Sequence, residues 1–257
     1  MSRKTVKTYL FYVNKFLLAN KDKPVKKFSK KDVREFLYKM EQSDVSGSTL
    51  NVAHNALRFM MIEILHKSCY LKIKYSKVPL KKPEYLTREE VFKILGVIDN
   101  YKHKVLVSLM YGAGLRVNEV VNLKINDFVF DESIGWVRNG KGSKDRAFII
   151  PDKIKEDLKS LCETNKYWLF PGRNGCLSVR TVQNIVEQAG LKAKVKKKVH
   201  PHMFRHSFTT HLFESGVDIA SVQNLLGHSR PETTLGYSHF SRPKMFNVKS
   251  PLDNQNV

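Results

Sequence analysis

The sequence predicts a mainly α-helical protein with a small antiparallel β-sheet, divided into two domains. Apolar residues recur at spacings of three and four along most of the 257 residues, which is the period of amphipathic helices. Residues 128–150 instead alternate in the manner of β-strands. Residues 67–86 contain two prolines, many lysines and little apolar periodicity. We therefore expect a linker there, between a helical domain at 1–66 and a larger domain at 87–257.

Three or four helices are expected in the first domain, and three of them can be placed. The first covers 5–18 and carries its apolar side chains on one face. The second begins after Ser29, a residue type that is favoured as an N-cap. A break at Gly47-Ser48 is expected before the third, which carries apolar residues over 50–65. The result would be a small bundle with a lysine-rich outer surface.

The second domain is expected to begin with a capping box. Thr87 and Glu90 occupy the two positions that bind free amides at the start of a helix. A strongly apolar helix follows over 104–111, and its composition indicates that it is buried. After the glycines at 112 and 114, the chain brings Arg116 to the start of a short helix.

A β-hairpin is expected in the middle of this domain. Strands are predicted over 128–130, 134–137 and 147–150. Asn139-Gly140 and the Gly-Ser pair at 142–143 favour a tight turn between the last two strands. Lys141 and Lys144 would therefore lie at the tip of the hairpin.

Helical patterns return in the rest of the chain, over 151–162, 178–189, 203–215 and 219–226. Gly216 and Gly227 follow the last two segments and are typical of helix C-termini. Asp218 is a plausible N-cap for the final helix. His202 and Arg205 are three residues apart, so they would lie on one face of a helix.

The charge of the chain indicates a polyanionic partner. Lysine and arginine number 45 against 24 acidic residues, which gives a formal net charge of +21. Residues 1–82 carry +13 of this charge and the remainder carries +8. Each phosphate that a cation neutralises releases counterions, so such an excess favours binding of nucleic acid. A solubilising lysine-rich surface is the alternative interpretation.

Cysteine content and hydropathy predict a cytoplasmic protein. The three cysteines show no paired spacing, which favours a reduced, intracellular chain. No apolar run approaches the eighteen or so residues that span a bilayer, and the N-terminus has no signal-peptide core.

Five short motifs together resemble the tyrosine recombinases, the family of integrases and Xer-type site-specific recombinases. They are Gly114-Leu115-Arg116-Val117-Asn118-Glu119, Asn139-Gly140-Lys141-Gly142, His202-x-x-Arg205, Leu226-Gly227-His228-Ser229 and Tyr237. Their order and spacing are similar to those of the family, which makes the set far more specific than any single motif. The resemblance is strong over 85–237, whereas the first eighty or so residues resemble the family in layout only.

The resemblance implies six catalytic residues: Arg116, Lys141, His202, Arg205, His228 and Tyr237. The two arginines and His228 would hold the scissile phosphate, because guanidinium groups make paired contacts with phosphate oxygens. Lys141 would donate a proton to the leaving 5′ oxygen, and His202 would assist the nucleophile. Tyr237 would attack phosphorus and form a 3′-phosphotyrosyl intermediate.

The resemblance also implies a fold, a substrate and partners. The first domain would be a helical core-binding domain, and the second a tyrosine-recombinase catalytic domain. The substrate would be double-stranded DNA with a specific recombination site, on which the protein self-associates as a tetrameric synapse. No cofactor is expected: the phosphotyrosyl bond conserves energy, so ATP is not required, and the spacings of a metal site are missing. The protein would act at the nucleoid, or in a host cytoplasm if a mobile element encodes it. Contacts with the DNA backbone are expected from Lys144, Arg146, Lys196, Lys197 and Lys198.

Three other interpretations remain open at this point. The histidines at 200, 202, 206 and 211 could suggest a metal site, but neither Cys-x-x-Cys nor His-Glu-x-x-His is present. His206 and His211 are therefore expected to be packing residues. A type IB topoisomerase would use similar chemistry to relax DNA. A non-catalytic DNA-binding protein of the same fold would have no use for Tyr237.

Overall fold

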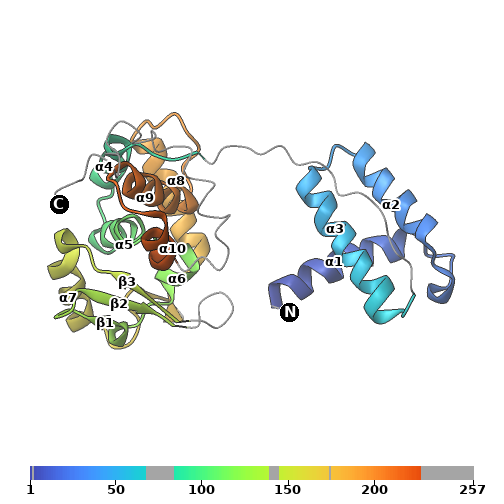
Figure 1. The fold of residues 1–257 in the computed structure, drawn as a ribbon, viewed down its shortest axis with the longest axis horizontal. Helices are drawn as coiled ribbons and strands as arrows, with labels where there is room; N and C mark the ends of the chain where they lie inside the picture. Colours follow the sequence, from blue (N-terminus) through green and yellow to red (C-terminus); the bar gives the residue numbers. More distant parts are fainter. Residues whose placement is uncertain (2, 68–83, 139–144, 174, 227–257) are drawn as a thin grey trace, which may run out of the picture. The chain divides into compact units, whose positions relative to one another are not determined.

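The chain forms two compact units, Met1–Lys82 and Pro83–Val257. The computed structural model describes residues 1, 3–67, 84–138, 145–173 and 175–226 (Figure 1). The boundary between the units falls inside the segment expected as a linker, most of which lies outside the described residues. The predicted fold class, mainly helical with a small antiparallel sheet and two domains, is confirmed.

The described part of the first unit is a bundle of three α-helices. They are α1 (Arg3–Ala19), α2 (Lys30–Gln42) and α3 (Gly47–Phe59), and α3 continues as a π-helical turn at Met60–Ile64 (Figure 1). A 3₁₀ turn at Val25–Lys27 lies between α1 and α2. Asp32 accepts hydrogen bonds from the backbone nitrogen and the hydroxyl of Ser29, each 2.7 Å long. The predicted start of α2 is therefore confirmed.

The break expected at Gly47-Ser48 was placed too late in the chain. Ser46 is the N-cap of α3, and its hydroxyl accepts a hydrogen bond of 3.3 Å from the backbone nitrogen of Thr49. Gly47 and Ser48 thus form the first turn of the helix. Serine is favoured both at helix N-caps and in turns, so the residue types alone did not show where the turn ends and the helix begins.

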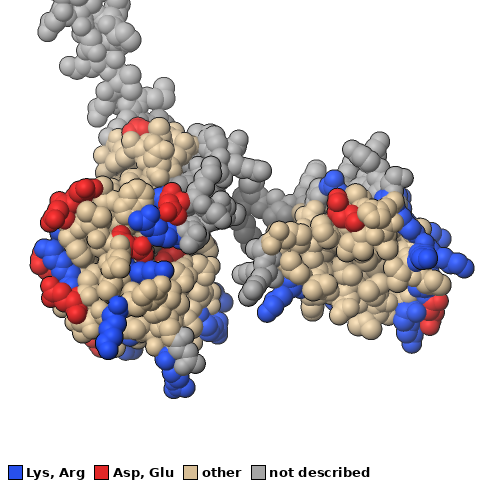
Figure 2. Space-filling view, turned by 90° about the horizontal axis from the view of Figure 1, so that it is seen from below, with Lys and Arg blue, Asp and Glu red and all other residues tan. Residues whose placement is uncertain are grey.

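Aromatic side chains fill the core of the first unit. The ring of Phe16 packs edge-on against Phe28 and Phe36, with centroid distances of 5.0 and 5.4 Å. Leu57 and Met61 are fully buried beside them. Figure 2 shows a largely uncharged face of this unit with lysine and arginine side chains at its margins.

Helix α5 lies at the centre of the second unit. The helices of this unit are α4 (Arg88–Gly96), α5 (Tyr101–Gly112), α6 (Val117–Val121), α7 (Lys155–Thr164), α8 (Val179–Lys192), α9 (Pro201–Glu214) and α10 (Ile219–Leu226). Helices α4, α6, α7, α8 and α9 all pack against α5 (Figure 1). The side chains of Leu106, Leu109 and Met110 are fully buried, which confirms the burial predicted for this segment.

The segment that enters the second unit is anchored to it. The backbone nitrogen of Leu86 donates a hydrogen bond of 2.8 Å to the Ser207 hydroxyl on α9. The Lys197 ammonium donates one of 2.9 Å to the carbonyl oxygen of Tyr85. Leu86, which the sequence assigned to the linker, is fully buried in the core of this unit. The predicted capping box between Thr87 and Glu90 follows directly.

The main sheet has the order β1–β2–β3, with antiparallel neighbours. Its strands are β1 (Phe128–Val129), β2 (Ile134–Val137) and β3 (Arg146–Ile149), and Val137 pairs with Arg146. The three predicted strands are confirmed, with β3 starting one residue earlier than expected. The hairpin tip at 139–144 lies outside the described residues. A second pair, β4 (Pro171–Gly172) and β5 (Gly175–Cys176), was not predicted.

Helix α9 is buried along most of its length, and α10 packs against α9 and β3. Pro201 stands in the first turn of α9, where its missing N–H costs nothing, so the helix begins two residues before the predicted start. Asp218 accepts a hydrogen bond of 2.9 Å from the backbone nitrogen of Ser221, which confirms the predicted cap of α10. Among the described helices, none has both the length and the apolar character that crossing a membrane would require.

Candidate active site

Glu119 is the centre of a cluster of arginines. Its carboxylate accepts a hydrogen bond of 2.7 Å from the Arg116 guanidinium and one of 2.8 Å from the Arg116 backbone nitrogen. Arg116 is the N-cap of α6, and Glu119 lies one turn into that helix. The side chain of Glu119 is 8% exposed and that of Arg116 is 27% exposed. Glu119 therefore holds Arg116 from the protein side, while part of the Arg116 side chain stays exposed to solvent.

Arg205 reaches the same carboxylate from α9. Its guanidinium donates hydrogen bonds of 2.6 Å to the carbonyl oxygen of Gly114 and 2.7 Å to that of Leu226. A nitrogen of Arg205 also lies 3.8 Å from Glu119. The structure thus brings Arg116 and Arg205 to one place, although 89 residues separate them in the sequence. Arg205 is buried, so packing as well as hydrogen bonds fixes its orientation.

Gly114 makes this convergence possible. Its backbone has a φ of 58°, the left-handed region that favours glycine. A Cβ atom at this position would lie 2.4 Å from the ring of Phe208 on α9. The glycine therefore allows the chain that leads to Arg116 to lie directly against α9.

Arg146 completes the cluster from β3. One nitrogen of its guanidinium lies 2.7 Å from Glu119, and another donates a hydrogen bond of 2.5 Å to the carbonyl oxygen of Leu225. Its side chain is 11% exposed. The sequence placed Arg146 among the contacts to the DNA backbone, whereas the structure places it against Glu119 and the end of α10.

The charges around Glu119 keep it ionised. Burial acts to raise the pKa of this carboxyl, but Arg146 and Arg116 outweigh burial and hold the pKa below its usual range. A carboxylate that stays negative can hold several guanidinium groups together while they present positive charge to an anion.

The histidines at the start of α9 have lowered pKa values. Desolvation lowers the pKa of His202, and nearby positive charges, including His200 and Arg205, lower it further. Desolvation also lowers the pKa of His206, to about 4, with His202 as the next largest cause. His202 is exposed, so its imidazole is accessible at the surface of the site. A lowered pKa favours the neutral form of the ring, which can accept a proton.

The same histidines do not form a metal site with other residues that the structure describes. His202 and His206 are one helical turn apart, with ring centroids 6.4 Å from each other. In the described ranges, no group of three or more His, Cys, Asp or Glu side chains could hold a metal ion. His211 instead pairs its Nδ1 with the hydroxyl of Tyr111 at 2.8 Å.

The lysines expected to contact DNA have different surroundings. Lys197 forms an ion pair of 2.7 Å with Glu90 in addition to its bond to the Tyr85 carbonyl, so its ammonium holds the protein together at this point. Lys196 and Lys198 are exposed. The remaining predicted site residues, Lys141, Lys144, His228 and Tyr237, lie outside the described residues.

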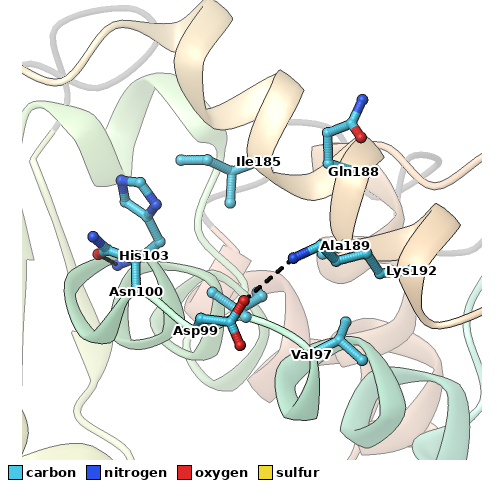
Figure 3. Close-up of a pocket in the computed structure, with 9 residues that line it drawn as sticks. Val97, Asp99, Asn100, His103, Ile185, Gln188, Ala189 and Lys192 are labelled. Atoms are coloured by element: carbon cyan, nitrogen blue, oxygen red, sulfur yellow. Dashed lines mark hydrogen bonds and ion pairs between the residues drawn. The ribbon is translucent and has the colours of Figure 1, made fainter.

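A pocket elsewhere in the second unit is separate from the arginine cluster. It has a volume of about 260 Å³ and lies between the start of α5 and α8. Lys192 and Asp99 form an ion pair of 3.2 Å at its edge (Figure 3). Arg116 follows the opposite end of α5, and a helix of twelve residues is about 18 Å long. The pocket is therefore not part of the candidate site.

Comparisons with known proteins show the family of the chain. Residues 84–243 match the model of the phage integrase family, and residues 1–69 match the N-terminal SAM-like domain of phage integrases. Tyrosine recombinase XerA of Pyrococcus horikoshii is 38% identical over 92% of this chain and 83% of its own length. A tyrosine recombinase of Thermosipho africanus is 34% identical over 98% of this chain and 94% of its own length.

Solved structures show the same similarity. The XerH site-specific recombinase bound to palindromic difH substrate, in a post-cleavage complex, has a TM-score of 0.77 and 26% identity. That similarity covers 93% of this chain and 77% of the XerH chain. The crystal structure of XerA recombinase has a TM-score of 0.57 and 29% identity over 93% of this chain and 88% of its own. Since the family match extends over both units and the relatives are similar along most of their length, this chain belongs to the phage integrase family and is a tyrosine recombinase.

Proposed function

We propose that the protein is a site-specific DNA recombinase, which cleaves and rejoins duplex DNA through a 3′-phosphotyrosyl intermediate. The observation that carries this proposal is the meeting of Arg116 and Arg205 at Glu119. Two guanidinium groups held by one carboxylate suit a phosphodiester, because the transition state places additional negative charge on the non-bridging oxygens. Removal of one such donor typically slows catalysis by about 10²–10³-fold.

The reaction needs four further contributions. The phenol oxygen of Tyr237 attacks phosphorus and forms a new P–O bond, while the bond from phosphorus to the 5′ oxygen breaks. Lys141 gives that leaving oxygen its proton. His228 donates a hydrogen bond to the phosphate, and His202, with its lowered pKa, accepts the phenol proton. Attack by a 5′ hydroxyl on the phosphotyrosine reverses these steps and joins strands.

No cofactor takes part in the proposed reaction. The phosphotyrosyl bond keeps the energy of the cleaved linkage, so ATP is not needed, and the arginines and Lys141 supply the charge stabilisation and the proton that a metal would otherwise supply. Covalent cleavage should therefore proceed in excess EDTA and without ATP. Restoration of a lost activity by Mg²⁺ or Zn²⁺ alone would contradict this mechanism. We further propose that the protein works on DNA in the nucleoid, as a tetramer on paired recombination sites.

Covalent trapping tests the proposal and identifies the target sequence in the same experiment. A pool of nicked duplexes with randomised sequence is incubated with the protein, and DNA that stays attached after denaturation is sequenced. The wild type should enrich one site, linked through a 3′ phosphate. The Tyr237→Phe variant should bind that site with the same affinity and form no adduct. An adduct that persists in this variant would place the nucleophile at another residue.

Strand exchange separates a recombinase from an enzyme that only relaxes DNA. Two duplexes of different length that carry the selected site are mixed with the protein. A recombinase produces duplexes of hybrid length, because each cleaved strand is joined to the partner duplex. Relaxation of supercoiled DNA without hybrid products would favour the topoisomerase interpretation.

A further inference from the structure

Three separate segments of the second unit meet at the side chain of Arg146. The arginine itself belongs to β3, which follows the hairpin tip at 139–144. One arm of its guanidinium is bound to Glu119 on α6, and the other is bound to the Leu225 carbonyl oxygen at the end of α10. Candidate catalytic residues lie at or next to all three segments: Lys141, Arg116 and His228.

Two arginines hold the end of α10 through consecutive carbonyl oxygens. Arg146 binds that of Leu225, and Arg205 binds that of Leu226. The last carbonyl groups of a helix have no partner within the helix and carry a partial negative charge, so cations stabilise them. The chain continues from Leu226 into Gly227 and His228. The two guanidinium groups therefore set the point from which this catalytic segment departs.

We infer that Arg146 is a positioning residue of the recombinase, which fixes the end of α10 relative to Glu119 and Arg116 and does not contact DNA. The inference rests on the proposed function, because the groups that it positions act in the proposed cleavage. Its side chain is 11% exposed and both of its arms bind protein acceptors. A guanidinium group that is bound in this way is not available to contact a DNA phosphate.

The charge of Arg146 also acts on Arg116 through Glu119. Among the residues that the structure describes, four groups with positive or potentially positive charge face this carboxylate: Arg116 from its own helix, Arg146 from β3, and Arg205 and His202 from α9. The charge of Arg146 is the largest single cause that lowers the pKa of Glu119 against the effect of burial, ahead of each hydrogen bond and charge of Arg116 taken singly. Without Arg146, the carboxylate loses a partner that orients it, and its hold on Arg116 weakens. The expected effect is on the rate of cleavage, since small displacements of positioned groups cost about 10²-fold in rate.

The test compares substitutions of Arg146 with a substitution of the exposed Lys196, a candidate DNA contact. The DNA is the duplex recovered by covalent trapping with the wild-type protein. Two quantities are measured for Arg146→Met, Arg146→Lys and Lys196→Met in the full-length protein: the dissociation constant across salt concentrations, and the single-turnover rate constant of adduct formation on saturating DNA. The amplitude of the single turnover gives the fraction of correctly folded protein separately from the rate constant.

Opposite results are expected for the two positions. Arg146→Met should lower the rate constant by about 10²-fold at unchanged affinity and salt dependence. Arg146→Lys should lower it less, because an ammonium keeps the charge but cannot bridge both acceptors. Lys196→Met should weaken binding and reduce the log–log salt slope by about one, an effect on affinity that Arg146→Met should not show.

Several outcomes would overturn the inference. A loss of affinity and a reduced salt slope for Arg146→Met, at normal rate constant, would identify Arg146 as a DNA contact. A lower amplitude at normal rate constant would mean that Arg146 serves folding only, and normal values throughout would mean that it has no role. If the wild type forms no adduct at all, the proposed function itself fails, and that result is distinct from these three.

A double substitution gives a second measurement. If Arg146 acts through Glu119, the combination of Arg146→Met with Glu119→Gln should cost less in rate than the sum of the two single effects, since both remove the same link. Additive effects would show that Arg146 does not act through this carboxylate.

Discussion

Glu119 decides where two arginines of the site lie, although it has no direct part in the proposed chemistry. A single buried carboxylate binds Arg116 and Arg146 and lies within 3.8 Å of Arg205. Buried charges are costly unless each has its partner, so removal of the common partner affects all of them at once. Replacement of Glu119 therefore tests how strongly the positions of these arginines depend on one carboxylate.

Glu119→Gln should destabilise the second unit by about 3–5 kcal/mol, because it leaves buried guanidinium groups without a counter-charge. Unfolding in denaturant followed by tryptophan fluorescence measures this, since Trp136 and Trp168 both lie in the second unit. Glu156→Gln is a matched control: Glu156 also pairs with a cation three residues away, but its side chain is 81% exposed. Little change is expected there. Equal effects of the two substitutions would contradict the central role of Glu119.

The lowered pKa of His206 predicts a pH-dependent stability. The unfolded chain protonates this histidine near its ordinary pKa of 6.5, whereas the folded protein does so only near 4. Between these values the unfolded state binds more protons, so the stability that His206 contributes is lost as the pH falls from 6.5 to 4. Each pH unit in this window costs about 1.4 kcal/mol per proton. His206→Gln should make the pH dependence of the fluorescence transition shallower in this range.

A control for the histidine prediction comes from the first unit. His54 is buried there and desolvation also lowers its pKa, but no tryptophan lies in that unit. His54→Gln should therefore leave the pH dependence of the tryptophan-monitored transition as it is in the wild type. An unchanged pH dependence in His206→Gln would show that His206 is not protonated differently in the folded and unfolded states.

At the scale of helices and strands, the close contact between the chain before Arg116 and α9 depends on Gly114. Gly114→Ala should destabilise the second unit by about 2–4 kcal/mol, because the alanine meets the Phe208 ring and takes a left-handed conformation. Gly96→Ala, at the end of α4, has open space within 4 Å of the added carbon. That substitution should be neutral or slightly stabilising. Denaturant midpoints compare the two, and similar midpoints would contradict a tight fit at Gly114.

Local sequence patterns predicted most elements of the fold, and their failures have physical causes. Capping residues such as Ser29 and Asp218 signalled helix starts correctly, because a cap bonds to amides only a few residues away. The pair β4–β5 escaped prediction because strands of two residues have no alternation to detect. The true surroundings of Arg146 were also hidden. Its partner carbonyl at Leu225 is 79 residues away in the sequence, and local spacing contains no information about such a contact.

The candidate site was predicted in a similar way, from motifs whose proximity only the fold creates. His202 and Arg205 could be placed on one helix from their spacing, and the structure has both on α9. The pairing of Glu119 with Arg116 is local, because the two residues belong to one motif and are three residues apart. The bond of Glu119 to Arg146 could not be expected, because that bond depends on how β3 packs beside α6. The assignments of Lys141, His228 and Tyr237 stay predictions.

At the scale of the whole molecule, positive charge is divided unequally between the two units. Residues 1–82 carry +13 in a unit of modest size. If both units bind one duplex, the binding of one unit raises the effective concentration of the other at the DNA, because both belong to one chain. The fragment from Pro83 onward should therefore bind DNA more weakly than the full chain and with a shallower log–log salt slope, because fewer counterions are released. Dissociation constants of both proteins across salt concentrations check this, and equal slopes would mean that the first unit only solubilises the chain.

The anchoring of Tyr85 and Leu86 also limits where the gene of such a protein can be joined to the gene of another N-terminal domain. Tyr85 is hydrogen-bonded to Lys197 and Leu86 to Ser207, so Tyr85 and Leu86 belong to the second unit. A different N-terminal domain could therefore be joined to this unit only upstream of Tyr85. Insertions or deletions before Pro83 would change the module or its tether and leave the catalytic fold intact. The same changes at Leu86 would displace α9, to which Leu86 is hydrogen-bonded and which carries Arg205. Exchange of modules, during evolution or by design, is therefore expected only upstream of Tyr85.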